Sequence, residues 1–180
     1  MKTKNLKLTV AYWMFWLLGM FAFFISGTWF FSSIHFFFAP ENFDNLSLLP
    51  IDFRFNPIEE TSMGTPLTEL YHWNVWWLFL QGILGFAAYG FIFLFARRIV
   101  QLVQRGKMFS PNQVKWFISI GIGFSILAVI VFFVPDFTAE EGRIKFSFNF
   151  GYILAAIVSF IMAEIFQEGN RLNEESKLTV

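Results

Sequence analysis

The sequence contains no cysteine and only two histidines, and just 14% of its 180 residues are charged. The lack of cysteine excludes disulfides, thiolate metal sites and cysteine nucleophiles. The low charge, together with a hydrophobic fraction of 56%, is far from the composition of an ordinary soluble domain. The chain is therefore predicted to be a membrane protein with the lipid bilayer as its solvent.

Motifs of catalysis and cofactor binding are also missing from the sequence. It has no G-x-S-x-G segment, no phosphate-binding loop and no dinucleotide fingerprint. His35 and His72 are expected near the external surface among carboxylates, but no short ligand spacing such as H-E-x-x-H accompanies them. We therefore expect no enzyme, no cofactor and no metal site. The basic surface is also too small for direct binding of nucleic acid.

Long apolar runs are what the chain has instead. A bilayer core requires about 20 apolar residues in a helix that crosses it. The first run is too long for a cleaved signal peptide and lacks a small-residue cleavage site, so we expect an uncleaved anchor. A single all-α domain over residues 1–180, a four-helix transmembrane bundle, is predicted. Its spans are expected at residues 8–31, 73–95, 117–134 and 148–166.

Lysine and arginine gather on one side of this arrangement. Ten of the 13 lie at the amino terminus, in the loop 96–116 or in the tail 167–180. The other three lie in the loops 32–72 and 135–147. Because basic residues concentrate on the cytoplasmic side of membrane proteins, both termini are predicted to be cytoplasmic and the latter two loops external.

Two external segments show the pattern of strands. Residues 51–55 and 144–148 alternate apolar and polar side chains with period two. Isolated strands are marginally stable in water, so these segments should lie on the bundle or pair with each other. We predict a small external β element, an antiparallel cap.

The loop 96–116 is predicted to be a helical hairpin. An apolar stripe continues past the second span at helical spacing, and Gly106 is the expected end of that helix. The next helix has a full set of start signals. They are Ser110 as N-cap, Pro111 at the first helical position, Gln113 in a capping box, and Phe109 with Val114 as a hydrophobic staple.

Charged residues of the loop and tail have two interpretations. Positive-inside topology and contact with anionic lipid headgroups explain the basic residues of the loop without a protein partner. The tail mixes charges with leucine and valine, so it is expected to fold back on the loop or to bind another protein. In either case its acids are expected to meet the basic loop. The candidate partner-facing residues are Arg97, Arg98, Arg105, Lys107, Glu168, Leu172, Glu174, Glu175, Leu178, Thr179 and Val180.

Glu164 is the only acid within an apolar run. Acids inside membranes are functional candidates, but this one lies within about one helical turn of the cytoplasmic end. It is expected either to form an ion pair with Arg97 or Arg98, or to take part in a proton or ion relay. A relay needs further polar groups inside the membrane, for which Gln81 is the main candidate.

The fourth span carries a ridge of small residues at intervals of four. These residues lie on one face of a helix and allow another helix to approach closely. The face is therefore predicted to pack against a neighbouring helix. It consists of Gly151, Ala155, Ser159 and Ala163.

Two segments resemble an uncharacterised bacterial family of four-span membrane proteins. Residues 106–114 fit its loop pattern G-x-x-F-x-x-x-N/Q-V, and the end of the chain fits its tail pattern L-x-E-E-x-x-L-T-V/I. Genes of this family often lie beside a small helix-turn-helix regulator. The resemblance implies a protein of the bacterial plasma membrane that modulates a DNA-binding partner.

These observations favour a non-enzymatic protein of regulatory or interaction type that acts through its cytoplasmic loop and tail. Two alternatives remain. One is a small transporter or channel subunit, a homo-oligomer that conducts a solute past Glu164. The other is a scaffold within a larger membrane complex.

Overall fold

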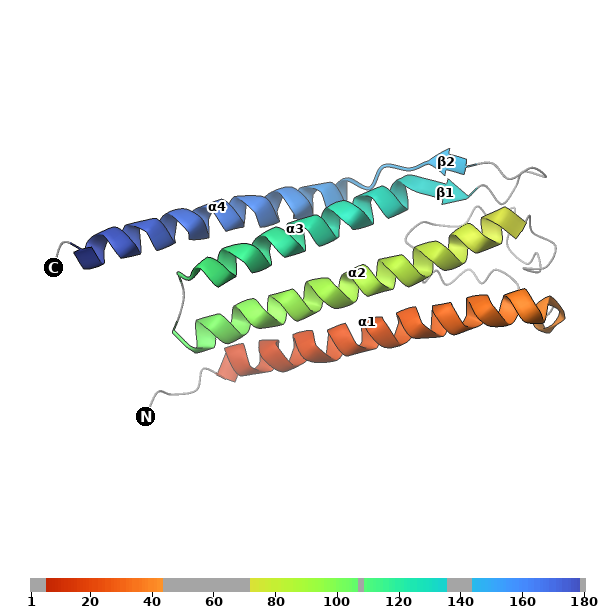
Figure 1. The fold of residues 1–180 in the computed structure, drawn as a ribbon, viewed down its shortest axis with the longest axis horizontal. Helices are drawn as coiled ribbons and strands as arrows, with labels where there is room; N and C mark the ends of the chain where they lie inside the picture. The colour runs from red at the N-terminus through yellow and green to blue at the C-terminus, as the bar shows by residue number, and fades with distance from the viewer. Residues whose placement is uncertain (1–5, 44–71, 107–108, 136–143, 179–180) are drawn as a thin grey trace. The chain divides into compact units, whose positions relative to one another are not determined.

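Four long helices make up most of the chain in the computed structural model, which describes residues 6–43, 72–106, 109–135 and 144–178 (Figure 1). All four are long and apolar enough to cross a membrane, so the prediction of an all-α membrane protein is confirmed. A short 3-10 helix, η1 (Pro40–Phe43), follows the first helix. The long helices are α1 (Leu6–Phe38), α2 (His72–Gln104), α3 (Pro111–Phe132) and α4 (Phe150–Leu178).

Three of the helices are longer than a bilayer requires. α1 and α2 have 33 residues each and α4 has 29. At about 1.5 Å per residue, 33 residues extend about 50 Å, against a hydrocarbon core of about 30 Å. α2 runs past residue 95, as predicted. α4 does not end at residue 166 but continues to Leu178, so the tail is a straight extension of the helix and does not turn back on the chain as expected.

A small antiparallel sheet joins the segments on either side of the last loop. β1 (Phe133–Pro135) pairs with β2 (Ile144–Phe146), with Phe133 opposite Phe146. The predicted strand at 144–148 is therefore confirmed for its first three residues. Its partner is the segment directly after α3. A short loop connects these two segments, so their pairing costs little loop-closure entropy. The other predicted strand, residues 51–55, lies outside the described part of the chain.

The chain divides into two compact units. The tail unit comprises Met1–Ala22, Ala88–Leu127 and Phe150–Val180. The sheet unit comprises Phe23–Ala87 and Ala128–Asn149. α4 belongs wholly to the tail unit, whereas α1, α2 and α3 each contribute a stretch to both.

Aromatic side chains form the core of the sheet unit. One cluster of buried residues consists of Phe36, Phe43, Val75 and Phe79, and Trp29 packs against it. Trp29 and Phe79 meet edge to face, with 5.8 Å between ring centroids. A hydrogen bond of 2.9 Å from Ser26 Oγ to the carbonyl of Ile83 also joins α1 to α2. Since lipid is as apolar as this core, close packing and such polar links are what hold the helices together.

Small residues and ring pairs bring the helices of the tail unit together. An ideal Cβ on Gly19 of α1 would lie 3.4 Å from the carbonyl oxygen of Gly90 in α2, which marks a close approach of these two helices. Tyr89 Oη donates a 2.8 Å hydrogen bond to Tyr152 Oη and so links α2 to α4. Phe95 of α2 stacks on Trp116 of α3 at 5.3 Å.

The ridge of small residues on α4 is buried in its second half only. Ser159 and Ala163 are 8% and 4% exposed, as the pattern predicts for a packing face. Ala155 is half-buried, and Gly151 is exposed. The ridge therefore begins to pack one to two turns later than its sequence spacing indicates.

Candidate functional site

The turn between α2 and α3 contains Gly106, the glycine predicted to end the helix. Gly106 has φ of 71°, the left-handed conformation that ends many helices, and its amide donates to the carbonyl of Val103 at 3.0 Å. α3 then begins at Pro111, and the amide of Gln113 donates to the Ser110 carbonyl at 2.9 Å. Both predicted boundaries are confirmed.

The side-chain part of the predicted cap is not formed. Ser110 Oγ has no hydrogen-bond partner within the described residues, so the serine side chain does not form its half of the expected capping box. Phe109, expected to staple onto Val114, contacts α4. Its ring centroid is 5.8 Å from that of Phe166, and it covers Gly169. The hairpin is thus held by an aromatic contact with the end of α4.

Adding a methyl group at Gly169 is expected to undock Phe109. An ideal Cβ there would lie 2.5 Å from two ring atoms, so the ring, which is 46% exposed, must turn into solvent. We expect little change in melting temperature for Gly169→Ala, because alanine favours the helix by about 1 kcal/mol over glycine and offsets the lost contact. Amide exchange at Phe109 and Gln113 should become faster.

Phe109→Ala is the matched variant, since it removes the same contact without the gain in helix propensity. It should show the same faster exchange together with a lower melting temperature. Unchanged exchange in both variants would mean that Phe109 does not hold the hairpin on α4.

Arg97 and Arg98 are neighbours in the sequence with different surroundings. The Arg97 guanidinium donates to the Tyr12 hydroxyl of α1, and its Cζ lies 4.4 Å from the Tyr12 ring centroid. Such cation–π contacts stabilise helix pairs when the cation is partly shielded from water. Arg98 is exposed and donates a 3.4 Å hydrogen bond to Gln101 Oε1. Arg97 therefore joins α1 to α2, while Arg98 faces outward.

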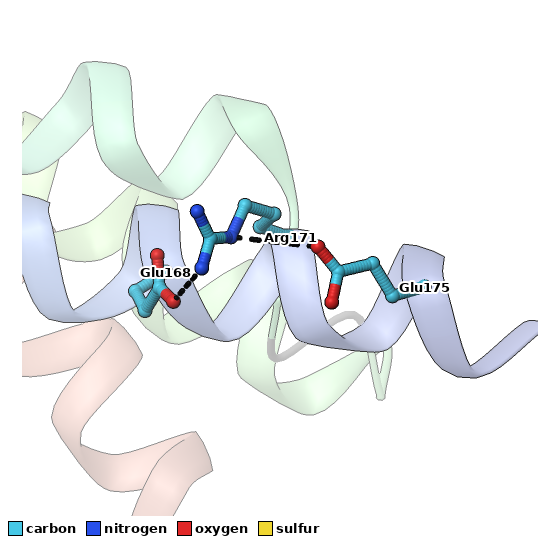
Figure 2. Close-up of polar contacts among 3 residues, drawn as sticks. All are labelled: Glu168, Arg171 and Glu175. Atoms are coloured by element: carbon cyan, nitrogen blue, oxygen red, sulfur yellow. Dashed lines mark hydrogen bonds and ion pairs between the residues drawn. The ribbon is translucent and has the colours of Figure 1, made fainter.

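The acids of the predicted tail are engaged along their own helix (Figure 2). Arg171 Nη2 lies 2.6 Å from Glu168 Oε1, and its Nε lies 3.6 Å from Glu175 Oε1. Asn170 Nδ2 donates to Glu174 Oε1 at 3.2 Å. These are the three- and four-residue spacings that support a helix. The expectation that these acids meet the basic loop is not fulfilled by any described basic residue of the loop.

The structure describes some of the other predicted partner-facing residues but not all of them. Leu172 is 54% exposed on α4, and Arg105 is exposed at the end of α2. Leu178 is the last residue of α4. Lys107, Thr179 and Val180 lie outside the described residues.

Glu164 forms neither of the predicted ion pairs. It is exposed on α4, and within the described residues no ion pair joins it to Arg97 or Arg98. Arg97 is turned to Tyr12 instead. The side chain of Glu164 shares the outward face of the helix with Ile161 and Glu168, three and four residues away.

Gln81 has a structural role that sequence reasoning missed. Its Nε2 donates to the carbonyl of Ile130 at 2.8 Å and also to the carbonyl of Phe133. Trp77 Nε1, one turn earlier on α2, donates to the same Phe133 carbonyl at 2.9 Å. The last carbonyls of a helix lack partners within it, so Gln81 satisfies the Ile130 carbonyl near the end of α3. Both side chains also satisfy the Phe133 carbonyl at the start of β1. The sequence signal for this role was a pair of side chains with N–H donors, Trp77 and Gln81, four residues apart on one helix.

The two histidines lie near the aromatic core of the sheet unit. His35 Nε2 is 3.1 Å from Asn42 Nδ2, and the His72 ring lies 6.4 Å from that of Phe36. Within the described ranges, no group of three or more histidine and acidic residues is placed to hold a metal ion.

The sequence of the chain matches a known protein family. A family model described as "Protein of unknown function (DUF2975)" matches residues 62–180, about two thirds of the chain. The chain belongs to this DUF2975 family. The match includes α2, α3, both strands and α4, and hence both segments on which the resemblance was based, whereas α1 precedes it. No curated protein and no solved structure matches the chain.

Proposed function

We propose that this DUF2975 protein is a non-enzymatic protein of the bacterial plasma membrane that binds a cytoplasmic regulatory partner through the end of α4. The observation that carries the proposal is the unbroken helix from the apolar run to Leu178. The predicted span ends near residue 166, so the last 12 residues extend about 18 Å beyond it. Such an extension serves no purpose in crossing the bilayer.

The end of α4 has the properties of a preformed binding helix. Arg171 bridges Glu168 and Glu175 on an exposed face, at spacings that support the helix. Leu172 is exposed beside them. A helix that is already folded pays less conformational entropy on binding than a flexible tail, and an exposed leucine can anchor it in an apolar groove.

The charge of this segment indicates the chemistry of the partner. Residues 167–176 contain three glutamates and one arginine. A partner surface with an apolar groove and a basic rim fits them, since charge complementarity raises association rates and favours the correct partner. The helix-turn-helix regulator implied by the family resemblance is the partner we propose.

Co-purification with a helix-turn-helix regulator, the kind of partner that the family resemblance implies, tests this function. Both proteins are expressed together, and the complex is isolated from detergent through a tag on the membrane protein. Leu172→Asn is expected to weaken capture of the regulator about tenfold, corresponding to about 1.4 kcal/mol of lost binding free energy.

Glu164→Gln is the matched control on the same helix. It removes one exposed negative charge about two turns before Leu172 and should leave capture unchanged. Failure of the parent protein to capture the regulator, or equal capture by Leu172→Asn, argues against the proposed function. Solute flux in proteoliposomes that Glu164→Gln abolishes would favour the transport alternative.

A further inference from the structure

The charges of the tail unit are separated between its helices. Its described charged residues on α1, α2 and α3 are all basic: Lys7, Arg97, Arg98, Arg105 and Lys115. All four acids of the unit lie on α4. The ends that carry the basic residues are tied together by the Arg97–Tyr12 contact and the Phe95–Trp116 stack. One end of the unit therefore has a basic side formed by three helices.

One face of α2 combines apolar and basic residues in order. Phe91, Arg98 and Arg105 follow one another at intervals of seven, which places them on the same face of the helix. Phe91 is 52% exposed, as expected of a residue that faces lipid chains. Arg98 and Arg105 are exposed one and two steps further along. The face changes from apolar to cationic where the predicted span ends, at residue 95.

The change from apolar to cationic side chains lies at the level expected for the lipid headgroups. Trp116, stacked on Phe95 and half-buried, is an aromatic residue of the kind that marks a membrane interface. Arg98 lies one turn beyond Phe95, and Arg105 about 10 Å further along the helix axis. Both side chains are long enough to reach phosphates at or near this level.

The positive charges of Arg98 and Arg105 are available to bind an anion. Arg97 is engaged with Tyr12, but no ion pair joins Arg98 or Arg105 to an acid of the described chain. The guanidinium group binds phosphate oxygens through paired N–H donors, a geometry that lysine lacks. The same face supplies Phe91 for the acyl chain. Free phosphate and nucleic acid have no acyl chain that could lie against this apolar side chain.

We propose that Arg98 of α2 and Arg105, directly after α2, form with the apolar face at Phe91 a binding site for an anionic phospholipid. The headgroup phosphate lies against the two guanidinium groups, and an acyl chain lies along the ring of Phe91. This site is independent of the proposed partner surface, which lies on α4.

Binding of phosphatidylglycerol to the purified full chain in a neutral detergent, measured by native mass spectrometry or by thermal shift, tests the site. Phosphatidylcholine and glycerol phosphate serve as the two comparison ligands. We expect the parent protein to prefer phosphatidylglycerol over both. Arg98→Gln/Arg105→Gln should weaken its binding at least about tenfold, given the attraction of each cation near an anionic surface.

Two further variants test whether lipid binding depends on this site and not on the net charge or the stability of the protein. Arg171→Gln removes one exposed cation from α4 and should keep the preference for phosphatidylglycerol. Arg97→Gln should lower the melting temperature without lipid, because the Tyr12 contact is lost, and still keep the preference. Equal affinity for phosphatidylcholine, equal affinity for glycerol phosphate, or unchanged binding by the double variant would overturn the proposal.

Discussion

A methyl group added at Gly82 is expected to lower the thermal stability of the protein, whereas the same addition at Gly27 is not. An ideal Cβ on Gly82 would lie 2.5 Å from Cδ2 and Cε3 of Trp29. The indole cannot easily retreat, because it packs against the buried core and meets Phe79 edge to face. Overpacking of this kind costs about 1–3 kcal/mol.

Gly27→Ala is the control because nothing lies within 4 Å of an ideal Cβ at that position. Both glycines are within long helices of the sheet unit, so both variants gain the same helix propensity, about 1 kcal/mol. The difference in unfolding free energy between the variants should therefore report the clash with Trp29 alone. Thermal unfolding in detergent, followed by tryptophan fluorescence, measures it. Equal melting temperatures would show that Trp29 moves aside freely.

The four helices could be predicted from the sequence because a single physical requirement determines them. A helix that crosses a bilayer needs a long apolar run, and such runs are hard to mistake. The end of α4 was missed because residues beyond 166 are polar and lose the apolar pattern. The signal that remained was the spacing of Glu168, Arg171 and Glu175, which supports a helix through ion pairs at three and four residues.

The partner of β2 was not predictable from alternation alone. Period-two patterns identify a strand but not the strand that pairs with it. β1 (Phe133–Pro135) has no alternation, because it continues the apolar run of α3. It forms because the chain returns after a short loop, and the Ser147 amide then donates to the Phe132 carbonyl at 2.9 Å.

The roles of Arg97 and Arg98 also required the structure. The two residues are identical in type and adjacent, but successive residues of a helix point about 100° apart. One therefore meets Tyr12 of α1, and the other faces outward. No feature of the sequence says which of the two is directed at the neighbouring helix.

Removing the amide of Gln81 is expected to destabilise the junction between α3 and the sheet. Gln81→Leu keeps most of the side-chain volume but deletes the donor to the carbonyls of Ile130 and Phe133. A buried carbonyl left without a partner costs about 1–3 kcal/mol. We expect a lower melting temperature and faster amide exchange at Val134 and Ser147. Ser125→Ala is the control, since its hydroxyl donates only to Gly121 within the same helix.

The two donors on α2 should act together, because they share an acceptor. Gln81 and Trp77 both donate to the Phe133 carbonyl, so either single variant leaves that oxygen one partner. Trp77→Phe with Gln81→Leu leaves it none, and the double variant should lose more stability than the two single variants added together. Strict additivity would mean that the shared carbonyl finds another donor. Non-additivity would establish that Gln81 and Trp77 share the Phe133 carbonyl of β1. The Gln81 amide would then be committed to the backbone and not to a proton or ion relay.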